Sequence, residues 1–175
     1  MFRSKPRLSV LAAALVALAA SAAPAASLEP DLRRIRTRSG ADATAVLAAL
    51  QGAQRKLQNG VCQQLLEDFR DEAGRPLRDN LAPFGLEPAD YLTLLVFADG
   101  GEQQKGALCR VRGVAAVTVP KGRVVYVCGS AFREMSLPHR EHALIHEMLH
   151  SLGLGENPPS AREINAAVWR RCGGY

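Results

Sequence analysis

Two histidines and a glutamate stand at a spacing that could bind and use a metal ion, in the stretch His146-Glu147-Met148-Leu149-His150. On a helix, residues four apart lie about 6 Å apart along the axis and on the same face, so both imidazoles could reach one ion. Glu147 points about 100° round the helix from His146, where its carboxylate could remove a proton from water beside the ion. The spacing predicts one zinc ion held by His146 and His150, with Glu147 as general base.

The flanking residues predict that this motif lies on a largely buried helix. The positions around it are apolar, and Glu147 is the one charged residue between Ala143 and Gly155. Upstream, Ser136 and Pro138 stand where a helix N-cap and first turn are expected. An ordinary core helix would leave the Glu147 carboxylate buried without a partner, which costs several kcal/mol. The sequence therefore favours a functional site over a purely structural helix.

Two downstream carboxylates are candidates for a third protein ligand. Glu163 belongs to a serine-x-x-glutamate pattern ahead of an apolar run, which also fits a helix capping box. Glu156 lies in a turn rich in glycine and proline and could equally be a solvated loop residue. The residues alone leave both open. His142 would lie about 12 Å from His150 along the helix, too far to share one ion, so His139 and His142 are expected at the surface.

The first 26 residues predict a secretory signal peptide. Arg3, Lys5 and Arg7 precede the apolar run Leu8–Ala20, and Ala23-Pro24-Ala25 is a small-residue cleavage pattern. That run is too short for a permanent anchor, and no later segment approaches the ~20 apolar residues of a transmembrane helix. We expect a secreted or periplasmic protein without a membrane anchor after cleavage. Residues 27–38 are expected to be a flexible lead-in, and residues 39–175 a single domain.

The balance of charges argues against nucleic acid as a partner. Of the 22 basic residues, three lie in the predicted signal peptide, and the remaining 19 exceed the 17 acidic residues by only two. So small an excess does not indicate a broad basic surface.

The four cysteines, Cys62, Cys109, Cys128 and Cys172, all follow the predicted cleavage site. An even number of cysteines in an oxidising compartment predicts two disulfides, for which three connectivities are possible. No two of them lie within four residues of each other, so the usual paired spacing of a zinc-thiolate site is absent.

Apolar spacing and turn residues predict an α+β fold. One helix is expected from Ser39 to a stop at Asn59-Gly60, and a shorter one after Pro88, ended near Asp99. Residues 62–69 keep helical spacing, whereas residues 69–76 could also be a strand that runs into a turn. The valine-rich segments Val111–Val119 and Val124–Val127 predict a β-hairpin. We expect a small sheet with this hairpin to pack on the helix through His150.

The part from Cys109 to Glu163 resembles the catalytic core of a secreted zincin metallopeptidase. The resemblance rests on the HExxH motif, on Gly153 three residues after it and on the strand just upstream. In metzincins the position of the last ligand matches Glu156, which the resemblance therefore favours. No methionine follows Met148, so the methionine turn of metzincins is missing. A gluzincin-like arrangement with Glu163 as the third ligand stays open.

The resemblance implies two further features. Zincins commonly pair an extended substrate with an edge strand beside the cleft, a role that would fall to Val124–Val127 if this strand lies at the sheet edge. Fungal-type secreted aspzincins have a similar hairpin flanked by two cysteines. That similarity implies a Cys109–Cys128 disulfide, with Cys62 bonded to Cys172.

The expected function is that of a secreted zinc-dependent peptidase. A zinc-activated water would attack the peptide bond of a peptide or protein substrate, with Glu147 as general base. Tyr91, Tyr126 and Arg140 are candidates for stabilising the oxyanion. The alternative is a disulfide-stabilised secreted binding module with a non-catalytic zinc site. Glu147 favours the enzyme, because a structural zinc site needs no general base.

Overall fold

The structure is a computed structural model and describes residues 28–101 and 109–173. The predicted signal peptide lies outside the described residues. The longer helices and the strands are α1 (Gly40–Leu57), α7 (Leu137–Ser151), α8 (Ala161–Cys172), β1 (Ile35–Arg36), β2 (Val96–Asp99), β3 (Ala116–Val117) and β4 (Val124–Val127). Shorter helical segments are η1 (Leu32–Arg34), α2 (Gly60–Gln63), α3 (Leu65–Asp68), α4 (Leu77–Leu81), η2 (Ala82–Phe84), α5 (Pro88–Thr93) and α6 (Gly129–Glu134).

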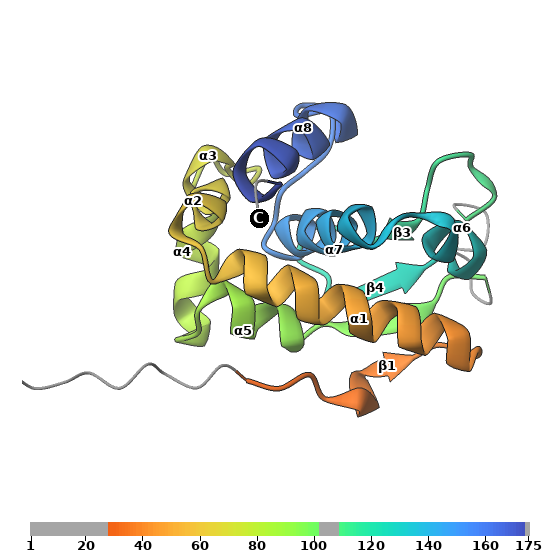
Figure 1. Cartoon of the computed structure of the whole chain (residues 1–175). Coiled ribbons are helices and arrows are strands. Elements are labelled where there is room, and N and C mark those ends of the chain that lie inside the picture. Colours follow the sequence, from red (N-terminus) through yellow and green to blue (C-terminus); the bar gives the residue numbers. More distant parts are fainter. Residues whose placement is uncertain (1–27, 102–108, 174–175) are drawn as a thin grey trace, which may run out of the picture.

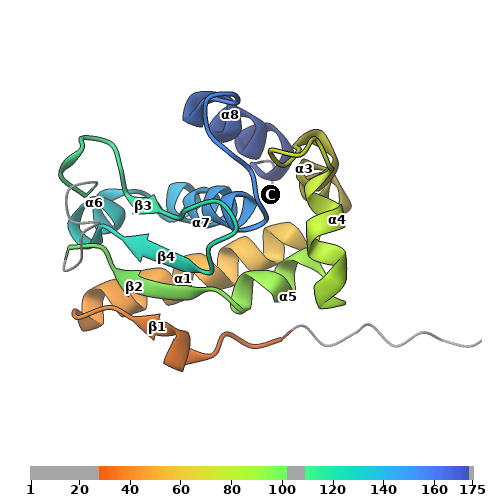
Figure 2. The same cartoon turned by 180° about the vertical axis from the view of Figure 1, so that it is seen from behind.

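The four strands form one sheet in the order β1-β2-β4-β3. β1, β2 and β4 run parallel to one another, and β3 pairs antiparallel with β4. Helices α1 and α7 cover one face of this sheet (Figure 1), and the view from behind shows its other face in front of the helices (Figure 2). The α+β class and the hairpin of β3 and β4 are therefore confirmed.

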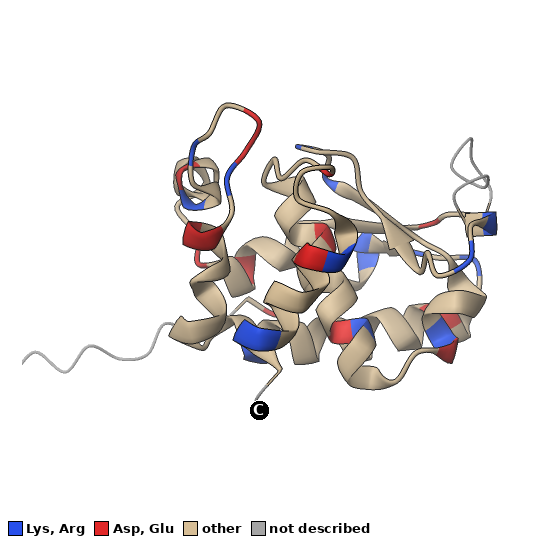
Figure 3. Ribbon diagram, turned by 90° about the horizontal axis from the view of Figure 1, so that it is seen from above, with Lys and Arg blue, Asp and Glu red and all other residues tan. Residues whose placement is uncertain are grey.

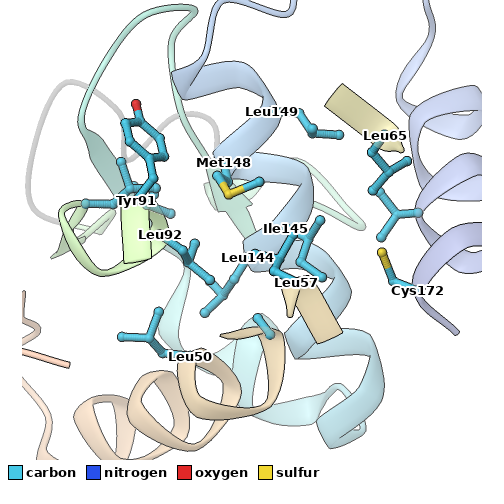
Figure 4. Packing of buried hydrophobic residues seen from close by; sticks show 14 of the residues in the cluster. Leu50, Leu57, Leu65, Tyr91, Leu92, Leu144, Ile145, Met148, Leu149 and Cys172 are labelled. Carbon is cyan, nitrogen blue, oxygen red and sulfur yellow. The ribbon is translucent and has the colours of Figure 1, made fainter. Parts of the chain in front are cut away.

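Helix α7 is the centre of the hydrophobic core. Its side chains Leu144, Ile145, Met148 and Leu149 are all 0% exposed. Figure 4 shows them packed among apolar side chains of α1, α3 and α5. Burying a side chain of this size contributes roughly 1.5–3 kcal/mol relative to leaving it exposed. The helix that carries the histidine motif is thus fixed on its apolar side by the rest of the fold.

Both disulfides have the pairing that the aspzincin resemblance implied. Cys62 is bonded to Cys172, and Cys109 to Cys128. The first bond joins α2 to the end of α8 across a separation of 110 residues, which in the chain-entropy estimate stabilises the fold by up to about 4–5 kcal/mol. It therefore holds α8 against the N-terminal helices.

The sheet differs from the expected one in two strands. Residues 27–38 were expected to be a flexible lead-in, but Ile35–Arg36 pairs with β2, and the Arg34 guanidinium donates to the Leu94 carbonyl at 3.0 Å. Ile35 and Arg36 thus belong to the sheet, although the segment has too few apolar residues to show a strand pattern. The run Leu94–Asp99 was expected to end a helix. Instead β2 lies there, between β1 and β4. A continuous apolar run of this kind is typical of a buried parallel strand.

The order of the strands decides which part of the hairpin lies at an edge. The zincin resemblance gave Val124–Val127 the substrate-pairing role if it lay at the sheet edge, but β4 is an inner strand between β2 and β3. Val125 and Val127 alternate with half-buried neighbours and point into the core, at 0% and 1% exposed. The edge next to β4 is formed by β3, which is shorter than the predicted strand, and β1 forms the opposite edge. Residues 69–76 form a turn closed by an isolated bridge between Arg70 and Pro76.

Residues of both charges are spread over the described part of the chain. Figure 3 shows acidic and basic residues interspersed along the ribbon rather than gathered on one face. None of the described helices is long and apolar enough to cross a membrane.

Candidate metal centre

The end of α7 is shaped by a tight turn at Gly153. This glycine has a φ of +104°, and its N–H donates to the His150 carbonyl at 2.8 Å. A glycine reaches this backbone conformation without steric cost. The turn reverses the chain and brings the Leu154 carbonyl to the His150 ring, 2.8 Å from Nδ1. The local sequence Gly-Leu-Gly after the motif therefore helps to orient a predicted ligand.

The two histidine rings face each other across a short gap. His146 Nε2 and His150 Nε2 lie 2.9 Å apart, and both residues are buried. Because a carbonyl oxygen only accepts, Leu154 fixes the proton of His150 on Nδ1 and leaves Nε2 with a bare lone pair. His146 Nδ1 lies 2.8 Å from Oδ1 of Asn165, which holds that ring in the same tautomer. Two lone pairs directed at each other are unfavourable unless a cation lies between them.

Glu156 completes a group that could hold a metal ion. One atom each from His146, His150 and Glu156 lies within 4.8 Å of the other two. Glu156 is exposed, whereas the two histidines are buried. Glu163 is placed elsewhere: its carboxylate accepts from the Ser160 N–H at 2.8 Å and forms a capping box at the start of α8. Of the two predicted third ligands, the structure brings only Glu156 to the histidines.

Glu147 is buried beside the histidines, at 6% exposed, and its Oε2 has no hydrogen-bond partner among the described residues. Burial raises the pKa of Glu147 to about 8, and the negative charge of Glu156 adds to this rise, whereas Thr118 opposes it. Burial and the neighbouring His150 lower the pKa of His146 to about 4, which keeps its imidazole neutral and able to bind a metal.

A groove of about 290 Å³ runs along these side chains. One wall is formed by residues 113–118, which include β3, and the floor is the histidine face of α7. The opposite wall comes from α8, where Ala161, Asn165 and Trp169 are four residues apart and share one helix face. The predicted ligands thus lie in an open groove, as a substrate-binding centre requires.

Two predictions about neighbouring residues are wrong. His142 was expected at the surface, but it is 4% exposed and packs edge-on against Trp169, with ring centroids 4.1 Å apart. Trp169 itself is 40% exposed and lines the groove. None of the proposed oxyanion stabilisers, Tyr91, Tyr126 and Arg140, lines it.

Sequence reasoning missed two groups that contact the predicted site. Asn165 holds His146, and Thr118 lies beside Glu147. The sequence offered no signal for Asn165, because it lies outside the buried apolar stripe of α8, which consists of Ile164, Ala167, Val168 and Cys172. For Thr118 the register of β3 was needed, which the valine-rich segment does not specify.

In comparisons with known proteins, no family model, no curated protein and no solved structure matches this chain. Function is therefore inferred from the site itself.

Proposed function

We propose that this chain is an exported zinc peptidase with a zincin-like domain, in which His146, His150 and Glu156 hold zinc and Glu147 is the general base. The observation that carries the proposal is the pair of Nε2 atoms 2.9 Å apart, with both Nδ1 atoms occupied by other partners. Two nitrogen ligands and one carboxylate leave a coordination position free, which is typical of catalytic zinc. The two disulfides are compatible with export.

The chemistry is divided between the ion and the protein. When bound, zinc would polarise the substrate carbonyl and lower the pKa of a water molecule toward ~7. The ionised form of Glu147 would be favoured by the positive charge of bound zinc. The Glu147 carboxylate then takes the proton of the attacking water and later gives it to the leaving amine, for which its free Oε2 is suited. Asn165 and the Leu154 carbonyl keep both imidazoles in the tautomer that binds a metal. No side chain forms a covalent intermediate.

The free edge of β3 is suited to bind an extended peptide. Cys128 N–H donates to the Ala115 carbonyl at 2.9 Å, and Val117 lies opposite Tyr126. Because bonded and non-bonded pairs alternate in an antiparallel ladder, the N–H and C=O of Ala116 point away from β4. They face the groove, where an added strand could pair with them. β3 therefore takes the role that we expected of Val124–Val127.

The direction of β3 sets the direction of the substrate. After the strand, Thr118 lies beside Glu147, and the Lys121 N–H donates to the His150 carbonyl at the end of α7. Trp169 lies toward the start of α7, where it packs on His142. A peptide antiparallel to β3 would run from the zinc toward Trp169. Residues after the cleaved bond would then contact this apolar end. A preference for large apolar side chains at those positions follows.

Metal analysis and an unbiased peptide-library digest test the proposal together. We expect one zinc per chain and cleavage that a chelator abolishes, with apolar residues enriched after the cleaved bond. Bound zinc without any cleavage would favour the alternative, a secreted binding module with a non-catalytic zinc site. A chain that binds no zinc would refute both.

A further inference from the structure

A second cavity lies behind the end of α7. It measures about 300 Å³ and shares none of its lining residues with the groove that contains His146, His150 and Glu156. Its walls come from α4, η2, α5 and the turn between β3 and β4, and Ser151 and Leu152 close it on the side of α7. The proposed peptidase mechanism uses none of these residues.

The cavity is lined by three cations and by no acidic side chain. These are Arg75, Lys121 and Arg123. Arg75 is partly neutralised, because its Nε and Nη2 donate to the Asp71 carboxylate at 3.1 and 2.8 Å. Lys121 and Arg123 have no ion-pair partner among the described residues, although the Arg123 guanidinium lies 4.8 Å from the centre of the Phe84 ring. Two uncompensated positive charges therefore face one cavity.

A buried hydroxyl group adds a donor to these charges. Tyr91 is 1% exposed, and its ring packs in the core with the hydroxyl directed away from Leu92 (Figure 4). The Tyr91 hydroxyl oxygen lies 3.3 Å from the Ser151 hydroxyl and 3.5 Å from the Ser151 carbonyl, and both distances are longer than the usual O–H···O hydrogen bond. Burial raises the pKa of Tyr91, whereas the hydrogen bond with Ser151 and the positive charge of Arg123 oppose that rise, so the hydroxyl lies within the field of that guanidinium. The hydroxyl is thus held only by long hydrogen bonds to Ser151 at the wall of a cationic cavity.

The end of α7 offers a simpler reason for cations at this position, because helix C-termini attract them. Its carbonyls, however, already have donors from other groups. The His150 carbonyl accepts from the backbone N–H of Lys121 and of Gly153, at 2.9 and 2.8 Å, and the Leu152 carbonyl accepts from Asn80 at 2.8 Å. The ammonium group of Lys121 and the guanidinium of Arg123 contribute to none of these bonds. They remain available to a ligand.

We propose that this cavity binds a phosphate group, held by Lys121, Arg123 and the Tyr91 hydroxyl, with Arg75 at its rim. Donors from several directions match a tetrahedral oxyanion with two charges better than a planar carboxylate with one. Charge-assisted hydrogen bonds to phosphate are stronger than neutral ones, and guanidinium is especially suited to them. The phosphate could be free in solution or belong to a lipid headgroup, which offers the same chemistry.

Titration of the zinc-loaded protein with inorganic phosphate, followed by calorimetry at constant ionic strength, tests this proposal. We expect one saturable site with a dissociation constant of about 1 mM or tighter. Arg123→Gln and Lys121→Gln should each weaken binding about tenfold or more, and Tyr91→Phe about threefold to tenfold. The matched control Arg55→Gln removes an exposed arginine of α1 and should change binding less than about twofold.

Two further comparisons make the outcome decisive. Binding that persists in Arg123→Gln and Tyr91→Phe but disappears in His146→Ala would place the phosphate on the zinc and overturn the proposal, as would the absence of saturable binding. Circular dichroism of each variant separates lost binding from lost folding. Sedimentation with vesicles containing phosphatidic acid distinguishes the sources. Vesicle binding that requires Arg123 would assign the site to a lipid phosphate, and its absence would assign it to the free ion.

Discussion

Asn165 offers a sharp test of how the fold prepares the metal ligands. Its Oδ1 lies 2.8 Å from His146 Nδ1 and holds the ring so that Nε2 faces His150. Replacing such a partner of a ligating histidine typically lowers metal affinity 10–100-fold, which corresponds to roughly 1.4–2.7 kcal/mol. We therefore expect Asn165→Ala to weaken zinc binding by a factor in this range.

The effect on folding should be much smaller. Asn165 is exposed on α8, and alanine is a better helix former than asparagine. The free energy of unfolding of the metal-free protein should therefore change by less than about 1 kcal/mol. Asn165→Asp keeps an acceptor at the same position and should retain zinc affinity.

Competition with a chromophoric chelator gives the zinc affinity, and urea unfolding of the metal-free protein gives the stability. Arg162→Ala, at another exposed position of α8, is the matched control and should leave zinc affinity unchanged. Zinc affinity of Asn165→Ala within about twofold of the unmodified protein would refute the proposed role of Asn165.

Three further predictions concern the third ligand, a buried histidine and a packed glycine. Glu156→Ala should lower zinc affinity far more than Glu163→Ala, measured by the same competition assay, because only Glu156 lies with the histidines. Burial lowers the pKa of His142 from 6.5 to about 4, and the positive charge of Lys56 adds to this effect. Between pH 4 and pH 6.5 the unfolded chain therefore binds more protons than the folded protein does. The contribution of His142 to stability is therefore complete above pH 6.5 and declines as the pH falls toward 4, and His142→Gln should flatten this part of the urea-unfolding profile. Gly52→Ala should cost about 1–3 kcal/mol in the same unfolding assay, because the added methyl group would overlap the buried Glu141 carboxylate.

Each of these predictions has a control within the chain. Gly40→Ala adds the same methyl group to α1, where nothing lies within 4 Å, and should not destabilise. His139→Gln removes an exposed histidine of α7 and should change the pH profile much less than His142→Gln, because the charge of His139 is only the smallest of the causes that lower the pKa of His142. Equal losses of zinc affinity in the two glutamate variants would contradict the assignment of Glu156.

The sequence was most informative where local chemistry decides the structure. The spacing of His146 and His150 implied one face of a helix, and the serine-x-x-glutamate pattern at Glu163 implied the capping box that forms there. These features depend on neighbours within one or two turns. The roles of His146, Glu147 and His150 in zinc binding and catalysis stay predictions.

Features that depend on distant contacts were beyond sequence reasoning. His142 is buried because Trp169, 27 positions away, covers its ring. The edge position of β3 follows from the pairing of β4 with β2, and a two-residue strand leaves almost no period to detect. The hairpin was predictable from its valines and its turn, but which of its strands is the edge depends on the rest of the sheet.

Peptide hydrolysis by the Glu147→Gln variant is the most direct test of the proposed mechanism. Glutamine keeps the size of the side chain and removes the group that accepts the proton from water. We expect the variant to bind zinc with unchanged stoichiometry and to lose hydrolysis by at least about 10²-fold. Hydrolysis at the rate of the unmodified protein, with zinc retained, would contradict the assignment of Glu147 as the general base.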